Sequence, residues 1–270
     1  MCEVLKVSKS GYYAWLSRPE SERHKVNRRL LSEIRMAHDR SRRTYGSPRV
    51  TVELKESGVS CSVNRVARLM SENGICAKRR RKFRATTDSK HSFAVAPNLL
   101  NRQFTIDYPN TVWVTDITYI WTSEGWLYLA GVVDLYSRMV VGWSMSNRIT
   151  QQLTLEALNQ ALGRRCPKPG LLHHSDRGSQ YAAGDYQQLL SEHQMTCSMS
   201  RKADPWDNAP MESFFGTLKT ELIYGEKFST REDAEMKIFE YIEVFYNRKR
   251  RHSSLGYKSP VDFERTATLT

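Results

Sequence analysis

The pattern of hydrophobic and polar positions between residues 112 and 146 is typical of β-structure. β-Branched and aromatic residues dominate 112–121, 126–133 and 138–146, and short turns separate these runs. Each run is too short and too rich in such residues for an amphipathic helix. We therefore predict three strands in an antiparallel meander.

Helical spacing alternates with strand-like runs in the part of the chain that follows. The expected elements are a helix near 150–163, a strand ending at Ser175, a helix near 184–193, a strand near 194–199 and a helix that carries Glu212. An antiparallel meander followed by this alternation predicts an α/β fold with a mixed sheet.

The first third of the chain is predicted to be helical. A helix at about Glu22–His38 places Val26, Leu30 and Ile34 at helical spacing. Two shorter helices are expected after it: one starts at Ser47-Pro48 and ends before Gly58, and the other is capped by Ser62 and ends at Gly74.

The second short helix has an apolar side formed by Val66, Leu69 and Met70, and Arg65 and Arg68 lie opposite. One interpretation is a helix-turn-helix near 47–74 whose second helix enters a DNA major groove. The other is an ordinary helical hairpin with solvated arginines.

A last helix is expected from Thr230 to about Arg248. Acidic residues gather at its start and Arg248–Arg251 at its end. The helix dipole alone favours this arrangement, so the basic end is no evidence for DNA contact.

The positive charge of the 270-residue chain is concentrated at one end. Residues 1–103 hold 23 Lys and Arg against 9 Asp and Glu, whereas residues 104–270 hold 18 against 20. This division suits a basic arm that holds a polyanion and a near-neutral domain that acts on it. An RNA or an anionic membrane would suit the charge alone as well.

Three acidic residues are the strongest candidates for chemistry. Asp116 lies in the middle of an apolar strand, where an ionised carboxylate is costly unless a cation or hydrogen-bond donors offset it. Asp176 follows a strand and Glu212 lies near a helix start; alone, the first would be a turn acceptor and the second a capping residue. Together the three favour a shared metal site.

Four segments carry a resemblance to a known family. Trp113–Tyr119, His174–Tyr181 and Asp207–Lys219 resemble the catalytic blocks of insertion-sequence transposases with a retroviral-integrase-like core, and Tyr246–Pro260 resembles the tail of the same group. The resemblance covers essentially the whole chain and is closest to the product of the second reading frame of such elements.

The resemblance implies an RNase H-like core and a catalytic triad of two aspartates and a glutamate. Asp116, Asp176 and Glu212 would be both catalytic residues and ligands of two Mg²⁺ ions per site, with Mn²⁺ as a possible substitute. The activity implied is cleavage at the element's ends and transfer of the exposed 3′-hydroxyl to target DNA.

DNA contacts are expected from basic residues in four places. Lys219 matches the family's basic residue seven positions after the glutamate; the run from Lys78 to Arg84 suits phosphates, although such a run is often a solvated linker. The full set is Lys219, Arg65, Arg68, Lys78, Arg79, Arg80, Arg81, Lys82, Arg84, Arg201 and Lys202.

Four regions follow from these patterns. They are a basic DNA-binding region at 1–84, a linker at 85–103, a catalytic core at 104–225, and a C-terminal helix and basic tail at 226–270. The expected partners are DNA, further copies of the chain on DNA, and a product of the upstream reading frame. No membrane span or secretory signal is visible, so we expect a cytoplasmic protein.

Other function classes would require particular residues or spacings in the sequence. An RNase H-type nuclease would need a fourth acid, for which Asp134 is the one candidate, and we interpret it as a turn acceptor. A tyrosine recombinase would need a His-x-x-Arg spacing, and this chain has none after His252. His173 and His174 are expected to have packing roles, because a Mg²⁺ site built from hard oxygen ligands does not need imidazole. A non-catalytic DNA-binding regulator derived from a transposase stays open as the alternative.

Overall fold

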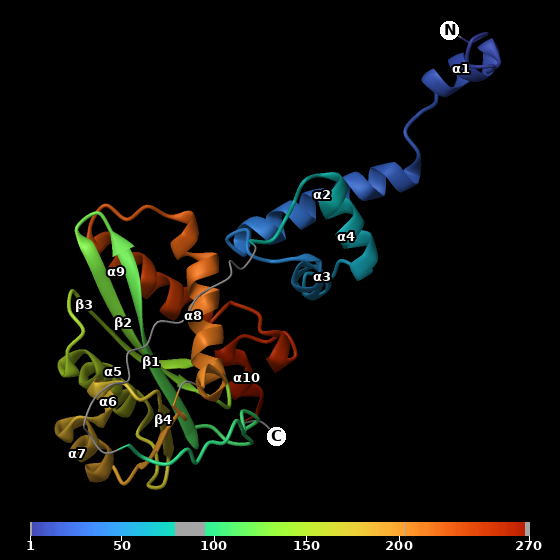
Figure 1. Ribbon diagram of the computed structural model, residues 1–270. Coiled ribbons are helices and arrows are strands. Elements are labelled where there is room, and N and C mark those ends of the chain that lie inside the picture. Colours follow the sequence, from blue (N-terminus) through green and yellow to red (C-terminus); the bar gives the residue numbers. More distant parts are fainter. Residues whose placement is uncertain (1, 79–94, 203, 268–270) are drawn as a thin grey trace. The chain divides into compact units, whose positions relative to one another are not determined.

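The computed structural model describes residues 2–78, 95–202 and 204–267, and it divides into two compact units, 1–78 and 79–270 (Figure 1). The expected α/β fold with a helical N-terminal region is confirmed. None of the helices within the described ranges is long and apolar enough to span a membrane.

The first unit contains α1 (Lys9–Leu16), α2 (Glu22–Arg40), α3 (Ser47–Glu56) and α4 (Val63–Glu72). Its core consists of the apolar sides of α2, α3 and α4: Leu30, Ile34, Val50, Leu54, Val66, Leu69 and Met70 are buried. Gly58 and Gly74 end α3 and α4 with φ values of +81° and +65°, which side chains rarely tolerate.

Two local expectations for this unit are wrong. Gly46, not Ser47, occupies the N-cap of α3, and no side chain caps it. Val26 is 46% exposed, although it shares helical spacing with the buried Leu30 and Ile34. Ser62 does cap α4, since its hydroxyl accepts from the backbone N–H of Arg65 at 3.3 Å.

The second unit is built on a five-stranded sheet with the order β3-β2-β1-β4-β5. Its strands are β1 (Val112–Thr122), β2 (Gly125–Asp134), β3 (Val140–Ser146), β4 (Leu172–Ser175) and β5 (Thr196–Met199). β1, β2 and β3 pair antiparallel, whereas β4 pairs parallel with β1 and β5 parallel with β4. This is the predicted meander followed by two parallel strands.

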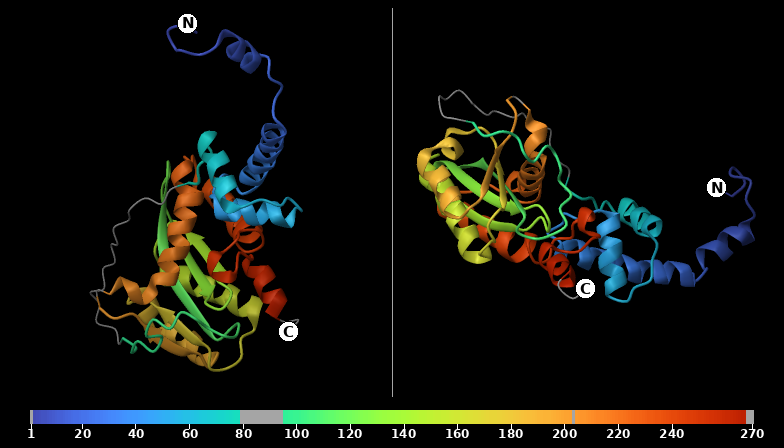
Figure 2. Two further views of the ribbon diagram at one scale, coloured as in Figure 1. Left: turned by 90° about the vertical axis from the view of Figure 1, so that its right-hand side faces the viewer. Right: turned by 90° about the horizontal axis from the view of Figure 1, so that it is seen from below.

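Helices cover both faces of the sheet (Figures 1 and 2). On one face, α5 (Gln151–Arg165), α6 (Ser179–Ala182) and α7 (Gly184–Glu192) form a core with Trp113, Ala130 and Val132. On the other face lies α8 (Ala209–Glu221), whose Met211, Phe214 and Phe215 pack against β2 at Gly131.

The contact between α5 and β3 requires a glycine. A Cβ atom at Gly142 would lie 2.2 Å from the carbonyl oxygen of Ala157 and 2.8 Å from the Cβ of Ala161. Gly142 therefore allows the backbones of β3 and α5 to approach closely.

The C-terminal part contains α9 (Arg231–Glu240), a π-helical segment (Tyr241–Tyr246), a 3₁₀ turn (Ser253–Leu255) and α10 (Pro260–Ala267). Thr230 caps α9 as predicted. α9 and the π-helical segment together match the helix expected from Thr230 to about Arg248, but the change to π-helical geometry was not predicted. The 3₁₀ turn, α10 and the one-turn α6 were not predicted either, because each is short and depends on tertiary contacts.

A buried ion pair joins α8 to the C-terminal part. The guanidinium of Arg250 donates to both carboxylate oxygens of Glu221 at 2.7–3.0 Å, and the Tyr241 hydroxyl donates to the same carboxylate at 2.8 Å. Arg250 is only 5% exposed. At least this arginine of the expected basic tail is therefore structural.

Candidate active site

Asp116 and Asp176 lie at the point where β1 and β4 separate. The parallel register pairs Val114 of β1 with His174 of β4, and each aspartate is two residues further along its own chain. Asp116 accepts from the backbone N–H of Ile117 at 2.8 Å, and Asp176 accepts from that of Gly178 at 2.8 Å. The register thus brings both carboxylates to one end of the parallel strand pair.

Glu212 reaches this region from the first turn of α8. The start of α8 is tied to β1, because the side-chain amide of Asn208 donates to the backbone oxygen of Thr115 at 3.1 Å. Thr115 immediately precedes Asp116, so this bond sets the distance between the helix start and the strand.

The charges of the other two acids act on Asp116. Burial raises the pKa of Asp116 well above its ordinary value, and the negative charges of Asp176 and Glu212 raise it further. The N–H of Ile117 lowers this pKa by more than the charge of Glu212 raises it, and the ammonium of Lys219 lowers it least, but burial and Asp176 outweigh both.

Three carboxylates match the hard oxygen ligands that Mg²⁺ and Mn²⁺ prefer. Among the described residues, however, no three His, Cys, Asp or Glu side chains lie close enough to surround one ion. The chemistry of the three carboxylates, taken by itself, fits divalent ions.

Lys219 lies between these acids and an aromatic ring. It is only 6% exposed, and its Nζ lies 4.7 Å from the centre of the Tyr119 ring. Burial lowers the pKa of Lys219, and the carboxylate of Asp116 partly offsets this effect. Lys219 is thus a buried cation beside Asp116 rather than a solvated surface lysine.

Asp207 holds together the segments that precede α8. Its carboxylate is fully buried and accepts from the Arg201 guanidinium and backbone N–H, from Arg102 Nε at 2.9 Å and from the Asn98 amide at 2.8 Å. We call Asn98, Arg102, Arg201 and Asp207 the Asp207 cluster. Asn208 occupies the N-cap position of α8 without a side-chain capping bond.

The predicted DNA-contacting residues have different surroundings. Arg201 is engaged by Asp207, and Arg65 donates to the side chain of Asn27 at 2.7 and 3.0 Å. Arg68 lies 3.7 Å from Glu72, whereas Lys202 and Lys78 are exposed. Arg79, Arg80, Arg81, Lys82 and Arg84 lie outside the described residues.

The residues that would mark other activities have structural roles. Asp134 is fully buried and accepts from the backbone N–H groups of Tyr136 and Asn110, which confirms it as a turn acceptor. Burial lowers the pKa of His173 to about 3 and that of His174 to about 4. Both rings are buried and neutral, and they contact the hydroxyls of Tyr186, Ser198 and Ser200.

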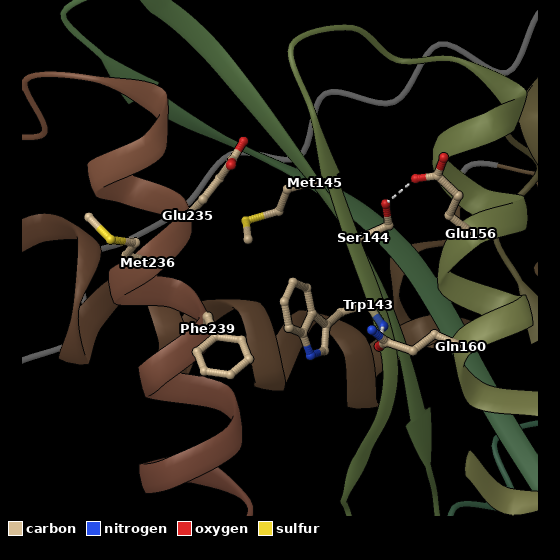
Figure 3. Close-up of a pocket in the computed structure, with 8 residues that line it drawn as sticks. All are labelled: Trp143, Ser144, Met145, Glu156, Gln160, Glu235, Met236 and Phe239. Atoms are coloured by element: carbon tan, nitrogen blue, oxygen red, sulfur yellow. Dashed lines mark hydrogen bonds between the residues drawn. The ribbon is translucent and has the colours of Figure 1, made fainter. Parts of the chain in front are cut away.

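A groove of about 530 Å³ lies elsewhere in this unit, between β3, α5 and α9 (Figure 3). Trp143, Met145, Met236 and Phe239 form its apolar part, while Glu156 and Glu235 add negative charge. None of the predicted site residues lines this groove, so it is separate from the three acids.

Known proteins resemble the chain over nearly its whole length. Models of an integrase core domain match residues 107–205 and 212–269, and a model of an HTH-like domain matches residues 25–83. An uncharacterized 31 kDa protein of insertion element IS600 from Shigella sonnei is 51% identical over 97% of this chain and 97% of its own length.

The transposase InsF for insertion sequence IS3A from Escherichia coli (strain K12) is 46% identical over 98% of this chain and 92% of its own length. Among solved structures, the HTLV-2 integrase catalytic core in complex with magnesium covers 57% of this chain and 96% of its own, at 18% identity and a TM-score of 0.46. The chain therefore belongs to the insertion-sequence transposases with an integrase core domain, the family of the InsF transposases of IS3.

Proposed function

We propose that the chain cleaves DNA at the ends of an insertion sequence and transfers the exposed 3′-hydroxyl to target DNA, with Asp116, Asp176 and Glu212 as catalytic residues. The observation that supports this most directly is the partly buried carboxylate of Asp116, whose pKa is raised by burial and raised further by the charges of Asp176 and Glu212. A site that concentrates negative charge in this way suits divalent cations.

The three carboxylates would hold two Mg²⁺ ions, for which Mn²⁺ can substitute. When bound, such ions activate the attacking oxygen and stabilise the leaving oxygen of an in-line displacement. The protein's own part is positioning: β1 and β4 fix the two aspartates, and the bond from Asn208 to Thr115 fixes the start of the helix that carries Glu212. No covalent intermediate with the protein is required.

DNA is the proposed partner of the N-terminal region and of the catalytic core. Residues 1–84 would bind duplex through the helix-turn-helix and its basic residues, residues 85–103 would link this region to the core at 104–225, and residues 226–270 would complete the core. The basic excess of residues 1–103 supports this division. We further propose a homo-oligomer on DNA, a partner from the upstream reading frame, and action in the cytoplasm.

The test is strand transfer by the purified chain with Mg²⁺ and labelled element ends, with and without the upstream product. Asp116→Asn, Asp176→Asn and Glu212→Gln should each reduce cleavage and transfer by at least about a thousandfold, since each removes a ligand of the ions, while DNA affinity changes by less than about twofold.

Asp134→Asn is the matched control, because Asp134 is a buried acid of the same sheet that accepts turn N–H groups. The folded fraction of this variant should retain transfer activity. Robust transfer by any one of the three triad variants would remove that residue from the site. Intact DNA binding with no transfer by the unmodified chain under any condition would favour the non-catalytic regulator.

A further inference from the structure

Three aromatic side chains gather at the far end of the β1–β2 hairpin. Trp121 and Trp126 are paired across the two strands, with ring centres 4.8 Å apart, and Tyr119 contacts Trp126 at 5.1 Å. All contacts are edge-to-face. Trp121 remains 59% exposed and Trp126 42% exposed. We call Tyr119, Trp121 and Trp126 the hairpin aromatic surface.

This surface is linked to the candidate active site through Lys219. Tyr119 follows Asp116 by three residues on the same strand, a rise of roughly 10 Å, and the two side chains leave β1 on opposite faces. The Nζ of Lys219 lies 4.7 Å from the Tyr119 ring centre, and the charge of the same lysine acts on Asp116. One cation therefore connects the acids to the aromatic rings.

The hairpin end is held in place by the segment between α8 and α9, beside which it lies in Figure 1. The backbone N–H of Ser123 donates to the oxygen of Phe228 at 3.0 Å, and the Arg231 guanidinium donates to the backbone oxygens of Glu124 and Trp126 at 2.7 and 3.1 Å. The Glu124 carboxylate accepts from the backbone N–H of Arg231 at 2.9 Å. These bonds keep the rings in position before any ligand arrives.

The chemistry of this surface suits one kind of occupant. Exposed indoles stack on nucleic-acid bases irrespective of sequence, and adjacent cations attract the phosphates between those bases. The Nζ of Lys219 lies over the Tyr119 ring, and the guanidinium of Arg231 bonds the backbone oxygen of Trp126. An apolar protein partner would make no use of these cations. The groove in Figure 3 differs from this surface because Glu156 and Glu235 make it acidic.

We propose that the hairpin aromatic surface is a stacking site for unpaired nucleotides of the DNA strand that enters the active site. Trp121 is the main stacking residue, and Lys219 leads the strand from the rings to Asp116. The proposal rests on the proposed function, because it assigns a subsite to the same DNA substrate. It predicts that separation of the terminal base pairs exposes bases that this surface captures.

The test uses the full chain without divalent ions, so that binding is measured apart from catalysis. The probes are a short fluorescent oligothymidylate and a blunt duplex. Trp121→Ala should weaken oligothymidylate binding by about fivefold or more, as expected for one lost stacked base. Duplex affinity should change by less than about twofold. Trp121→Phe should retain most of the affinity.

Phe239→Ala is the matched control, because Phe239 is a 49% exposed aromatic residue of the same unit outside the surface. It should bind both probes like the unmodified chain. In a second readout, an oligothymidylate carrying 5-iododeoxyuridine should cross-link to a peptide from residues 112–134.

Two results would overturn the inference. One is equal oligothymidylate binding by Trp121→Ala and the unmodified chain. The other is a change in oligomeric state in Trp121→Ala without a change in oligothymidylate binding, which would identify a protein interface. The proposed function is tested separately by strand transfer with Mg²⁺, so a chain that transfers strands but shows no Trp121 effect refutes the stacking site alone.

Discussion

Asp116 is a residue whose position is unfavourable for folding and favourable for the proposed chemistry. Its carboxylate is flanked by two further acids, and burial together with these charges disfavours its ionised form. Residues placed for function in this way commonly reduce stability.

Replacing Asp116 should therefore stabilise the protein when no divalent ion is present. Asp116→Asn keeps the size of the side chain and removes the disfavoured charge, so we expect the free energy of unfolding to rise by about 0.5–2 kcal/mol at neutral pH. Thermal unfolding in a chelator, followed by circular dichroism, measures this. Mg²⁺ should stabilise the unmodified chain more than the variant, and a lower melting temperature for Asp116→Asn in the chelator would contradict the argument.

Several residues could be identified from the sequence, but their contacts could not. Asp116, Asp176 and Glu212 were singled out by chain position and by the family's motifs, and in the structure the charges of Asp176 and Glu212 act on Asp116. Periodicity placed Lys219 on the same side of α8 as Glu212 but could not show that Tyr119 would lie beneath its ammonium group. Likewise, nothing local to Arg65 indicated Asn27 as its partner.

At the scale of elements, the Asp207 cluster joins two segments that are distant in sequence. Asn98 and Arg102 precede β1, whereas Arg201 and Asp207 precede α8. No sequence pattern links residues about a hundred positions apart, so this cluster was missed. It ties Arg201 and Asp207, which lie shortly before α8 and Glu212, to the segment that precedes β1.

Asp207→Asn should destabilise this loop in a pH-dependent manner. The hydrogen bonds from Arg201 hold the pKa of Asp207 well below its ordinary value, so the ionised form stabilises the fold. This contribution is complete above the unfolded-state pKa of about 3.9 and disappears as the pH falls through the lower native pKa. We expect a loss of about 1–3 kcal/mol at pH 7, which diminishes in acid.

Unfolding in urea between pH 7 and pH 3 measures this difference for the variant and the unmodified chain. If Asp207 positions Glu212, the variant should also lose kcat more than substrate affinity in strand transfer, while still folding at low temperature. A stability difference that is independent of pH would show that the carboxylate's charge is unimportant.

The side chain of Asn247 makes the hydrogen bonds that a neighbouring strand would otherwise make with the edge strand β3. The amide of Asn247 accepts from the backbone N–H of Val140 at 3.0 Å and donates to its carbonyl oxygen at 2.9 Å. Asn247 directly follows the π-helical segment. Sequence patterns did not predict this geometry, so they could not predict that Asn247 bonds the backbone of β3. Such pairing also protects an edge strand from association with other strands.

Asn247→Ala should leave both backbone groups of Val140 without a partner. Because the site is buried, we expect a loss of about 2–4 kcal/mol in the free energy of unfolding, from two unsatisfied groups at about 1–2 kcal/mol each. Denaturant unfolding provides the measurement. Asn159→Ala, at an exposed position of α5, should change stability by less than about 0.5 kcal/mol, and equal effects of both variants would refute the role of Asn247.

At the scale of the whole molecule, the two units differ in charge as well as in fold. Residues 1–78 carry 16 Lys and Arg against 8 Asp and Glu, and residues 79–270 carry 25 against 21. The division into a basic helical unit and a catalytic unit could be predicted from sequence, because net charge and hydrophobic periodicity both change along the chain. How each arginine is paired within a unit could not be predicted, because pairing depends on tertiary contacts.

The position of the basic residues in the chain, rather than its net charge, should therefore decide DNA affinity. Replacing Lys78, Arg79, Arg80, Arg81, Lys82 and Arg84 by Gln lowers the net charge from +12 to +6. Replacing six exposed basic residues of the second unit, Arg148, Arg164, Lys168, Lys227, Arg248 and Lys249, lowers it equally. If the first set contacts phosphates, only its loss should reduce the slope of log affinity against log salt, by about 0.9 for each contact removed. Fluorescence anisotropy with a duplex across a salt series measures both slopes. Equal reductions would mean that net charge alone attracts the DNA, and the run from Lys78 to Arg84 would then be a solvated linker.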